Sequence, residues 1–263
     1  MPKPRSKPDL ATIGGLLLAL VGIVGGLLLE GGQIKDIVQI TAAIIVLGGT
    51  FGAVMVNTPL ATLKAGLVRG GRVWFEDPAS PQERLETLIS FAAKARRNGL
   101  VSLETEAASI EDAFFRKAMT IAIDGADLQD LQRILELEID LERERAEQEA
   151  KVFESAGGYA PTIGIIGAVL GLIQVMKNLS NVAEVGHGIA VSFVATVYGV
   201  ALANILFLPA ANKIKARAHD ESQLRELTLH GVVGIVEGLN PKILRLKLEA
   251  FAPPATARPG GER

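Results

Sequence analysis

The sequence predicts an all-α, polytopic membrane protein with four transmembrane helices and a large helical cytoplasmic region. The mean hydropathy is positive, at +0.32, although 21% of the residues are charged, as in a membrane protein with a substantial water-exposed part. Four apolar windows approach the roughly 20 residues needed to cross a hydrocarbon core about 30 Å thick. These windows are residues 10–29, 37–56, 157–176 and 187–208.

The first window follows the basic segment MPKPRSKPD, so a cleaved signal peptide is the alternative to a retained first helix. Its apolar run is long for the core of a signal peptide, and no small-residue cleavage site is clear. A second apolar window also follows after only a short turn. We therefore expect the first helix to be retained.

Lys and Arg residues near the ends of the windows predict the orientation. They gather before the first window, at the start of the middle region and after the fourth window, whereas the two short connections hold one lysine each. We therefore place both termini and the middle region in the cytoplasm. The predicted parts are an N-terminus (1–9), a transmembrane pair (10–56), a cytoplasmic helical region (57–156), a second transmembrane pair (157–208) and a cytoplasmic tail (209–263).

The middle region is predicted to hold three helices, without a competing strand pattern. The first begins at Pro81 after an N-cap at Ser80 or Asp77, and ends at a Gly99 C-cap. The second covers 102–125, and the third begins near Asp127 and becomes charged on nearly every face by residues 142–151. We interpret this charged run as a solvated helix extending from the bilayer, with a binding motif as the alternative. The Pro- and Gly-rich end, 252–263, is predicted to be disordered.

Composition excludes several classes of site. The chain has no cysteine and only three scattered histidines, so we expect no disulfide, no metal centre and no cofactor. The net charge of −2 gives no electrostatic footprint for nucleic acid.

No Asp, Glu, Lys or Arg lies well inside any of the four windows. Proteins that move ions usually need an ionisable group within the membrane, because it gives the ion a partner where water is scarce. This chain therefore either carries no ion or forms one wall of a pathway whose carboxylate comes from another polypeptide.

Small residues in the windows are spaced to let helices approach closely. In the third window Gly164 and Ala168 are four residues apart, as are Gly167 and Gly171. The fourth and first windows carry similar series, which are Gly188, Ser192, Thr196, Gly199 and Ala203, and Gly15, Ala19, Gly22 and Gly26. Such patterns are common in membrane helices, so ordinary packing and a functional pore face both remain open.

Polar residues and prolines at the same windows favour a hydrated, deformable lining. Thr162 follows Pro161 at the start of the third window, and Thr196 and Tyr198 lie within the fourth, ahead of Pro209. A threonine can also bond to its own helix, which is the simpler interpretation of either hydroxyl. Each proline leaves a backbone carbonyl without its helical donor and permits a bend.

Two segments then carry a family resemblance. GGYAPTIGIIGAVLGLIQVMKNL, followed by GHGIAVSFVATVYGVALANILFLPAANKIK, resembles the MotA/PomA family of flagellar stator proteins, relatives of ExbB and TolQ. The similarity extends over essentially the whole chain. It implies a multi-pass protein of the cell inner (cytoplasmic) membrane, with a MotB-like single-span, peptidoglycan-binding partner that supplies the ion-binding aspartate.

The resemblance also implies an assembly and roles for single residues. Five such subunits would surround two partner chains, and ion flow would be coupled to torque on the rotor protein FliG. Pro161 matches the proline of the third span and Pro209 that of the fourth, and Thr196 matches the threonine near the partner's aspartate. With Thr162, Tyr198 and Ala168, these residues are our candidates for the ion pathway and its coupling.

In the cytoplasmic region, KARRNGLVSLE resembles the rotor-facing motif. The resemblance places Arg96 and Glu104 at the charged positions that engage FliG, with Arg97 as a neighbouring helper. From the residues alone, Arg96 and Arg97 are a basic pair at a helix C-terminus, favoured by the helix dipole. Exposed ion pairs add little stability, about 0–1 kcal/mol, so the value of these charges would lie in steering and registering a partner.

The transported ion is predicted to be the proton, with sodium as the alternative. Sodium-driven relatives tend to carry a threonine where this chain has Ala168, and a methyl group cannot supply an oxygen ligand.

Three other functions compete with the stator. An ExbB/TolQ-like energiser of outer-membrane processes would use the same ion chemistry, but such proteins typically have three spans and no N-terminal hairpin. A self-sufficient transporter or membrane enzyme is disfavoured, because the sequence has no intramembrane charge, nucleophile motif or phosphate loop. A purely structural scaffold would tolerate changes at Pro161, Thr196 and Pro209.

Overall fold

The structure, a computed structural model, describes residues 7–76, 80–177 and 182–252. The chain forms two compact units. The first, here called the span unit, comprises Met1–Asp77 and Ala146–Ala216, and the second, the helical unit, comprises Pro78–Arg145 and Arg217–Arg263. Two of the boundaries fall within long helices, Leu128–Lys177 and Leu208–Val236.

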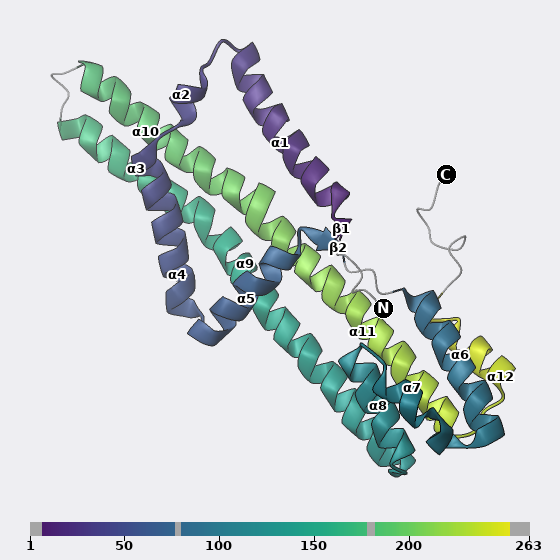
Figure 1. Cartoon of the computed structure of the whole chain (residues 1–263). Coiled ribbons are helices and arrows are strands. Elements are labelled where there is room, and N and C mark those ends of the chain that lie inside the picture. The colour runs from purple at the N-terminus through teal and green to yellow at the C-terminus, as the bar shows by residue number, and fades with distance from the viewer. Residues whose placement is uncertain (1–6, 77–79, 178–181, 253–263) are drawn as a thin grey trace. The chain divides into compact units, whose positions relative to one another are not determined.

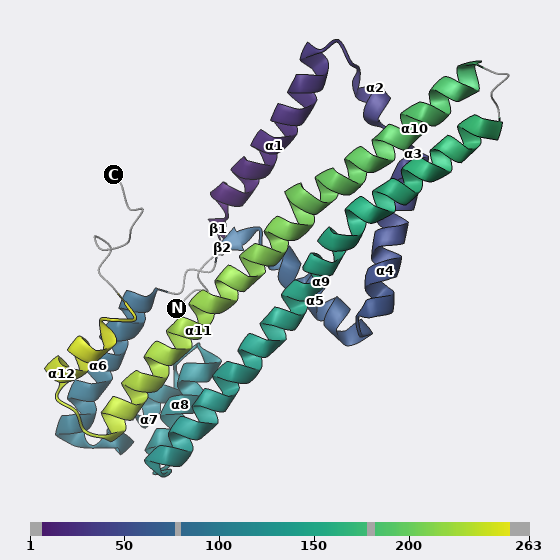
Figure 2. The same ribbon diagram turned by 180° about the vertical axis from the view of Figure 1, so that it is seen from behind.

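Helices make up nearly all of the span unit (Figures 1 and 2). Its elements are β1 (Lys7–Pro8), α1 (Leu10–Leu29), α2 (Ile34–Ile37), α3 (Ile40–Ala43), the π-helix η1 (Ile44–Gly48), α4 (Gly49–Asn57), α5 (Leu60–Arg72), β2 (Phe75–Glu76), the later part of α9 (Leu128–Lys177), α10 (Val182–Ala201), the π-helix η3 (Leu202–Phe207) and the start of α11 (Leu208–Val236). The strands β1 and β2 pair antiparallel over two residues each.

Within the described residues, four helical segments are long and apolar enough to cross a membrane. The first matches the predicted window, Leu10–Leu29, and the second is Ile34–Asn57. The third and fourth windows fall in helices that continue far beyond them, α9 and the α10–α11 segment. The predicted all-α fold with four transmembrane helices is therefore confirmed.

The second span is interrupted near its start. Val38 and Gln39 adopt extended conformations between α2 and α3, and the π-helix η1 follows within the same span. Extended backbone at membrane depth leaves polar groups that must be satisfied by other parts of the protein. The window at 37–56 did not indicate this interruption.

The helical unit is built from α6 (Pro81–Asn98), the 3₁₀-helix η2 (Leu100–Leu103), α7 (Glu104–Ala108), α8 (Ala113–Ile123), the start of α9, the end of α11 and α12 (Pro241–Leu248). Its core contains fully buried leucines from five of these helical segments together with Met119 of α8. The leucines are Leu88, Leu103, Leu131, Leu135, Leu227, Leu229, Leu244 and Leu248.

The predicted caps of α6 are confirmed, whereas the single helix predicted over 102–125 is wrong. The Ser80 hydroxyl accepts from the Glu83 amide, and Gly99 ends α6 with a φ of 81°. The predicted second helix is broken between α7 and α8. Asp112 has an extended backbone there, and its side chain accepts a hydrogen bond from the Phe115 amide as the N-cap of α8. The predicted disordered end, 252–263, lies outside the described residues apart from its first residue.

The predicted third helix does begin beside Asp127, and it then continues without a break through Pro161 to Lys177. The interpretation of the charged run as a helix that continues into a span therefore agrees with the structure.

Candidate functional site

Glycines form the contact between α9 and α10, which lie side by side and antiparallel in both views (Figures 1 and 2). A Cβ atom at Gly164 would lie 2.9 Å from the Ala195 carbonyl oxygen, and one at Gly171 would lie 3.0 Å from the Gly188 carbonyl oxygen. The two backbones are thus too close for larger residues at these positions. Small residues therefore serve helix packing here, as in other membrane helices.

The segment α3–η1–α4 packs along one side of this α9–α10 contact. Ile45 of η1 lies against Gly167 of α9, and Ile163 of α9 lies against Gly49 of α4. On α10, the side chains facing this segment are Val194 and Ala195, which form a cluster with Ala42 and Val46. One side of the contact is therefore covered by the chain itself.

Pro161, Ala168 and Thr196 flank the other side of the contact. Pro161 and Ala168 are seven residues apart, so they share a stripe of α9, and this stripe adjoins that of Gly164 on the side away from α4. The Cα atom of Thr196 lies 3.4 Å from the Cβ position of Gly164. All three side chains are half-buried in the single chain. The structure thus brings three of the six predicted pathway residues to one open side of the helix pair, here called the open face.

The threonine hydroxyls bond within their own helices. Thr162, which is exposed, donates to the Tyr159 carbonyl oxygen over 2.8 Å, and Thr196 donates to the Ser192 carbonyl oxygen over 3.4 Å. A hydroxyl that donates to its own helix keeps its lone pairs available as acceptors. Either threonine can therefore still accept a hydrogen bond from a water molecule.

Tyr198 lies away from the open face, two residues after Thr196 on the opposite side of α10. Its hydroxyl donates to the Ile37 carbonyl oxygen over 2.5 Å and accepts from the Gln39 amide over 3.2 Å. These are the backbone groups exposed by the interruption between α2 and α3. Tyr198 thus satisfies the broken backbone of the second span, a contact that its position in the sequence did not indicate.

The two prolines lie on adjoining parts of the helices. Pro161 lies within the continuous helix α9, and Pro209 follows η3 at the start of α11, where it is exposed. A Cβ atom at Gly157 would lie 2.6 Å from the Leu208 side chain, so the turns before the two prolines are in contact. Because proline cannot donate its backbone hydrogen bond, the wider turns of η3 just before Pro209 relieve the helix there.

Thr50 of α4 is a buried polar residue that the sequence did not single out. Its side chain is fully buried, and its hydroxyl has no hydrogen-bond partner among the described residues. A threonine normally bonds to the carbonyl oxygen four residues earlier, and that residue, Val46, belongs to the π-helix η1. The feature that distinguishes Thr50 is therefore the irregular backbone before it, and the sequence does not reveal that backbone.

Helix α1 is anchored at its N-terminus and exposed along its length. Asp9 accepts from the Thr12 amide as N-cap, forms an ion pair with Lys213 of α11, and donates its own amide to the Trp74 carbonyl oxygen. The hydrogen bond from Lys213 holds the pKa of the Asp9 carboxyl far below its usual value, despite burial, which opposes this shift. The glycines of the predicted small-residue stripe, Gly15, Gly22 and Gly26, have no neighbouring atoms within contact distance in the described chain.

In the helical unit, a tight turn presents the predicted rotor-facing charges. Arg96 and Arg97 end α6, the chain reverses at Gly99, and Glu104 begins α7. All three charged side chains are exposed, and among the described residues neither Arg96 nor Glu104 forms an ion pair. The turn is closed by Lys94, whose ammonium contacts both carboxylate oxygens of Glu106 at 2.6 Å.

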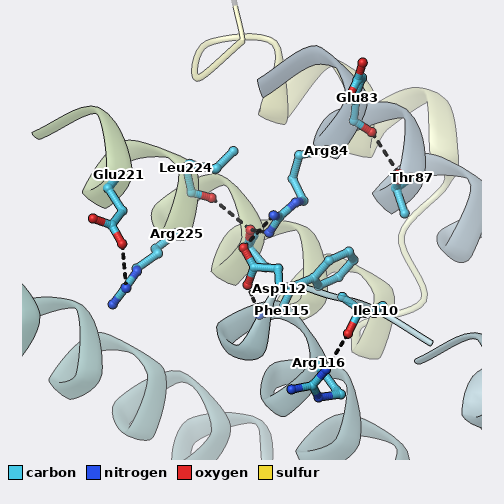
Figure 3. Close-up of polar contacts among 11 residues, drawn as sticks. Glu83, Arg84, Thr87, Ile110, Asp112, Phe115, Arg116, Glu221, Leu224 and Arg225 are labelled. Atoms are coloured by element: carbon cyan, nitrogen blue, oxygen red, sulfur yellow. Dashed lines mark hydrogen bonds and ion pairs between the residues drawn. The ribbon is translucent and has the colours of Figure 1, made fainter. Parts of the chain in front are cut away.

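An arginine network holds α6 against its neighbours (Figure 3). The guanidinium of Arg84 donates to Asp112 over 2.7 Å and to the Thr228 hydroxyl over 2.9 Å, and it lies over the Phe115 ring. Burial alone would raise the pKa of Asp112, but the Phe115 amide and the Arg84 guanidinium outweigh burial and lower it. The exposed turn at the end of α6 is thus carried by a helix fixed to both α8 and α11.

Comparisons with known proteins match this architecture. The model of the MotA/TolQ/ExbB proton channel family matches residues 106–227, and that of the motility protein A N-terminal family matches residues 13–99. Motility protein A of Bacillus subtilis (strain 168) is 34% identical over 249 residues, covering 93% of this chain and 91% of the relative.

Two solved structures are also similar. The structure of C. jejuni MotAB has a TM-score of 0.89 and 33% identity, covering 92% of this chain and 95% of that one. The flagellar MotAB stator complex from Bacillus subtilis has a TM-score of 0.88 and 32% identity, covering 94% and 97%. The chain therefore belongs to the MotA family of motility proteins, within the MotA/TolQ/ExbB proton channel family.

Proposed function

We propose that this flagellar stator subunit conducts protons along its open face together with a MotB-like partner, and transmits the resulting movement to the rotor protein FliG. The observation that carries the proposal is the open face itself. Pro161, Ala168 and Thr196 lie there, beside a contact whose other side the chain has already covered. No Asp, Glu, Lys or Arg lies well inside any of the four windows, so in this proposal the carboxylate comes from a partner helix.

The proton is favoured over sodium by the side chains of the open face. Ala168 offers a methyl group, and the Thr196 hydroxyl is the only side-chain oxygen among the three residues of that face. Sodium needs several oxygen ligands to replace its water, whereas a proton can pass along hydrogen bonds.

The proposal includes an assembly and an orientation. Five copies would surround two single-span, peptidoglycan-binding partner chains in the inner membrane, with both termini and the helical unit in the cytoplasm. The basic residues at the cytoplasmic ends of the spans support this orientation. Arg96, Arg97 and Glu104 would then face FliG.

The ion pathway is tested by comparing Thr196→Val with Thr196→Ser in a deletion strain that also expresses the partner. Valine keeps the shape but removes the hydroxyl, so swimming speed and proton uptake should both fall, whereas serine should retain most of each. Pro161→Ala should reduce swimming while the subunit remains assembled in the membrane. Normal proton uptake by Thr196→Val would show that this hydroxyl is not part of the pathway.

The choice of ion is tested in the same strain. Swimming should persist when sodium is removed and stop when a protonophore is added. Motility that collapses without sodium but survives a protonophore would reject proton coupling.

The rotor contact is tested by charge reversal. Arg96→Glu and Glu104→Lys should each reduce torque without lowering the amount of stator in the membrane, because both side chains are exposed. A matched control, Glu237→Lys, reverses another exposed charge of the helical unit outside the turn and should leave torque unchanged. Equal losses in all three variants would argue against a specific contact at the turn.

The ExbB/TolQ-like alternative is not favoured. The match to the motility protein A N-terminal family covers the N-terminal helix pair from residue 13 onward. The similar solved structures are MotAB complexes.

A further inference from the structure

Helix α5, which directly follows the second span, carries a basic groove that the ion pathway and the rotor contact do not use. The groove is open, has a volume of about 320 Å³, and is lined by Lys64, Ala65, Val68, Arg69, Arg72 and Glu149. Three of these six residues are cationic, and α5 itself contains no acidic residue. We propose that this groove binds the phosphate headgroup of an anionic phospholipid of the surrounding membrane.

The position of α5 in the unit is fixed by glycines. A Cβ atom at Gly66 would lie 3.0 Å from the Val152 side chain and 3.1 Å from the Glu149 carbonyl oxygen, and one at Gly70 would collide with the Phe153 ring. The glycine side of α5 therefore lies directly on α9. Because this side is buried, the opposite side of the helix must face the surroundings of the unit.

The outward side of α5 has the composition of a helix at a membrane surface. Leu60, Leu67 and Val68 are 59%, 49% and 62% exposed, and they alternate with the exposed cations Lys64 and Arg72. Apolar side chains mixed with basic ones, without acidic ones, are typical of helices in the plane of the headgroups.

The residues before and after α5 also indicate that this helix lies at the membrane surface. Only two residues separate α5 from the end of the second span at Asn57, so the bilayer surface must lie close to Leu60. The single tryptophan, Trp74, follows α5 and is half-buried. Tryptophan is enriched at membrane interfaces, where its ring contacts the chains and its N–H contacts the headgroups.

The charges within the groove favour an anion. Arg69 forms a 2.5 Å ion pair with Glu149, and both side chains are largely buried, so the one carboxylate among the lining residues is already neutralised. Lys64 and Arg72, both exposed, are the other two cations that line the groove. Guanidinium and ammonium groups are the usual ligands of phosphate, and basic pockets beside transmembrane helices on the cytoplasmic side bind anionic headgroups.

A lipid is favoured over a soluble phosphate compound because the groove combines its cations with exposed apolar side chains. The methyl groups of Val68, which lines the groove, would contact the acyl chains while Lys64 and Arg72 contact the headgroup. Leu67, exposed elsewhere on α5, would also lie among lipid. A free phosphate ion would leave these apolar side chains in water.

The test uses the full chain purified with its partner from membranes. Thermal unfolding is measured after adding phosphatidylglycerol, phosphatidylcholine or inorganic phosphate, and the phospholipids that co-purify are quantified. Phosphatidylglycerol should raise the midpoint by several degrees, whereas the other two additions should have little effect. Lys64→Gln with Arg72→Gln should abolish this shift and lower the co-purified anionic lipid at least threefold.

Two controls separate the groove from general charge effects. Lys242→Gln removes an exposed cation of the helical unit and should keep the full response to phosphatidylglycerol. Arg72→Lys retains the charge and should keep most of it. An equal response of the double variant and the unchanged chain, or equal stabilisation by phosphatidylcholine, would overturn the proposal, and equal stabilisation by inorganic phosphate would assign the groove to a free anion.

Discussion

Gly199→Ala tests the close contact between α9 and α10 most directly. A Cβ atom at Gly199 would lie 3.1 Å from the Ala160 carbonyl carbon and 3.2 Å from the Gly164 Cα atom, and still closer to the Ala160 oxygen. All three are backbone atoms of the neighbouring helix, so no side-chain rotation can relieve the collision. The two helices would have to separate by several tenths of an ångström or more.

The expected cost of this separation is about 1–3 kcal/mol, the range found when a well-packed core is overfilled. Part of the cost is offset, because alanine is favoured over glycine in a helix by about 1 kcal/mol. Gly158→Ala is the matched control, since it makes the same change in α9 where no atom lies within 4 Å of the new methyl group. It gains the helix propensity without the collision.

The measurement is unfolding of the purified complex in mild detergent, by titration with a denaturing detergent or by heating. Gly199→Ala should be less stable than Gly158→Ala by about 1–3 kcal/mol. A strain that carries Gly199→Ala should also swim more slowly at equal expression, because separation of the helices displaces Thr196 relative to α9. If the two variants unfold at the same midpoint, α9 and α10 are not packed through Gly199 in the assembled protein.

Three further outcomes follow from the ionic contacts. Arg84→Met should destabilise the helical unit by about 2 kcal/mol by leaving the Asp112 carboxylate without its guanidinium. Since the pKa of Asp112 is lowered in the folded state, its contribution is present above about pH 4 and is lost as the pH falls, so chemical denaturation should show the cost of Arg84→Met shrinking in acid. Lys213→Met should loosen the anchor of α1 at Asp9, which a shift in the emission of the single tryptophan would report. Burial lowers the pKa of His230, so stability should fall as the pH drops from about 7 toward 5, and this dependence should be absent in His230→Gln.

Local signals in the sequence were sufficient to predict the positions of the four spans and the caps of α6. An uninterrupted apolar run sets the limits of Leu10–Leu29, and Ser80, Pro81 and Gly99 mark the ends of α6 by their own backbone preferences. Each of these features depends on residues within a few positions of one another. The family resemblance added the partner and the candidate site residues, which local signals do not contain.

Breaks that depend on distant contacts were not predicted. The interruption at Val38 and Gln39 is stabilised by Tyr198, about 160 residues later in the chain, so nothing near residue 38 indicates it. The break before α8 is stabilised by Asp112, whose second oxygen binds Arg84 of another helix. In the first case a distant side chain bonds to backbone groups that a continuous helix would have paired. In the second case a distant guanidinium pairs with the charge of the capping carboxylate.

The small residues of α9 show why the open face could not be distinguished from a packing face by sequence alone. Gly164 and Ala168 are four residues apart and obey the same spacing rule, yet Gly164 lies against the backbone of α10 and Ala168 flanks the open face. What differs is whether another helix of the same chain already occupies that side, which depends on where α3–η1–α4 packs. Because that segment covers one side of the α9–α10 pair, a partner helix that supplies a carboxylate has one side left from which to reach both Ala168 and Thr196. The proposed function therefore requires the partner's acidic side chain to enter on this side, and a cysteine there in the partner should cross-link to a cysteine at Ala168 but not to one at Tyr198.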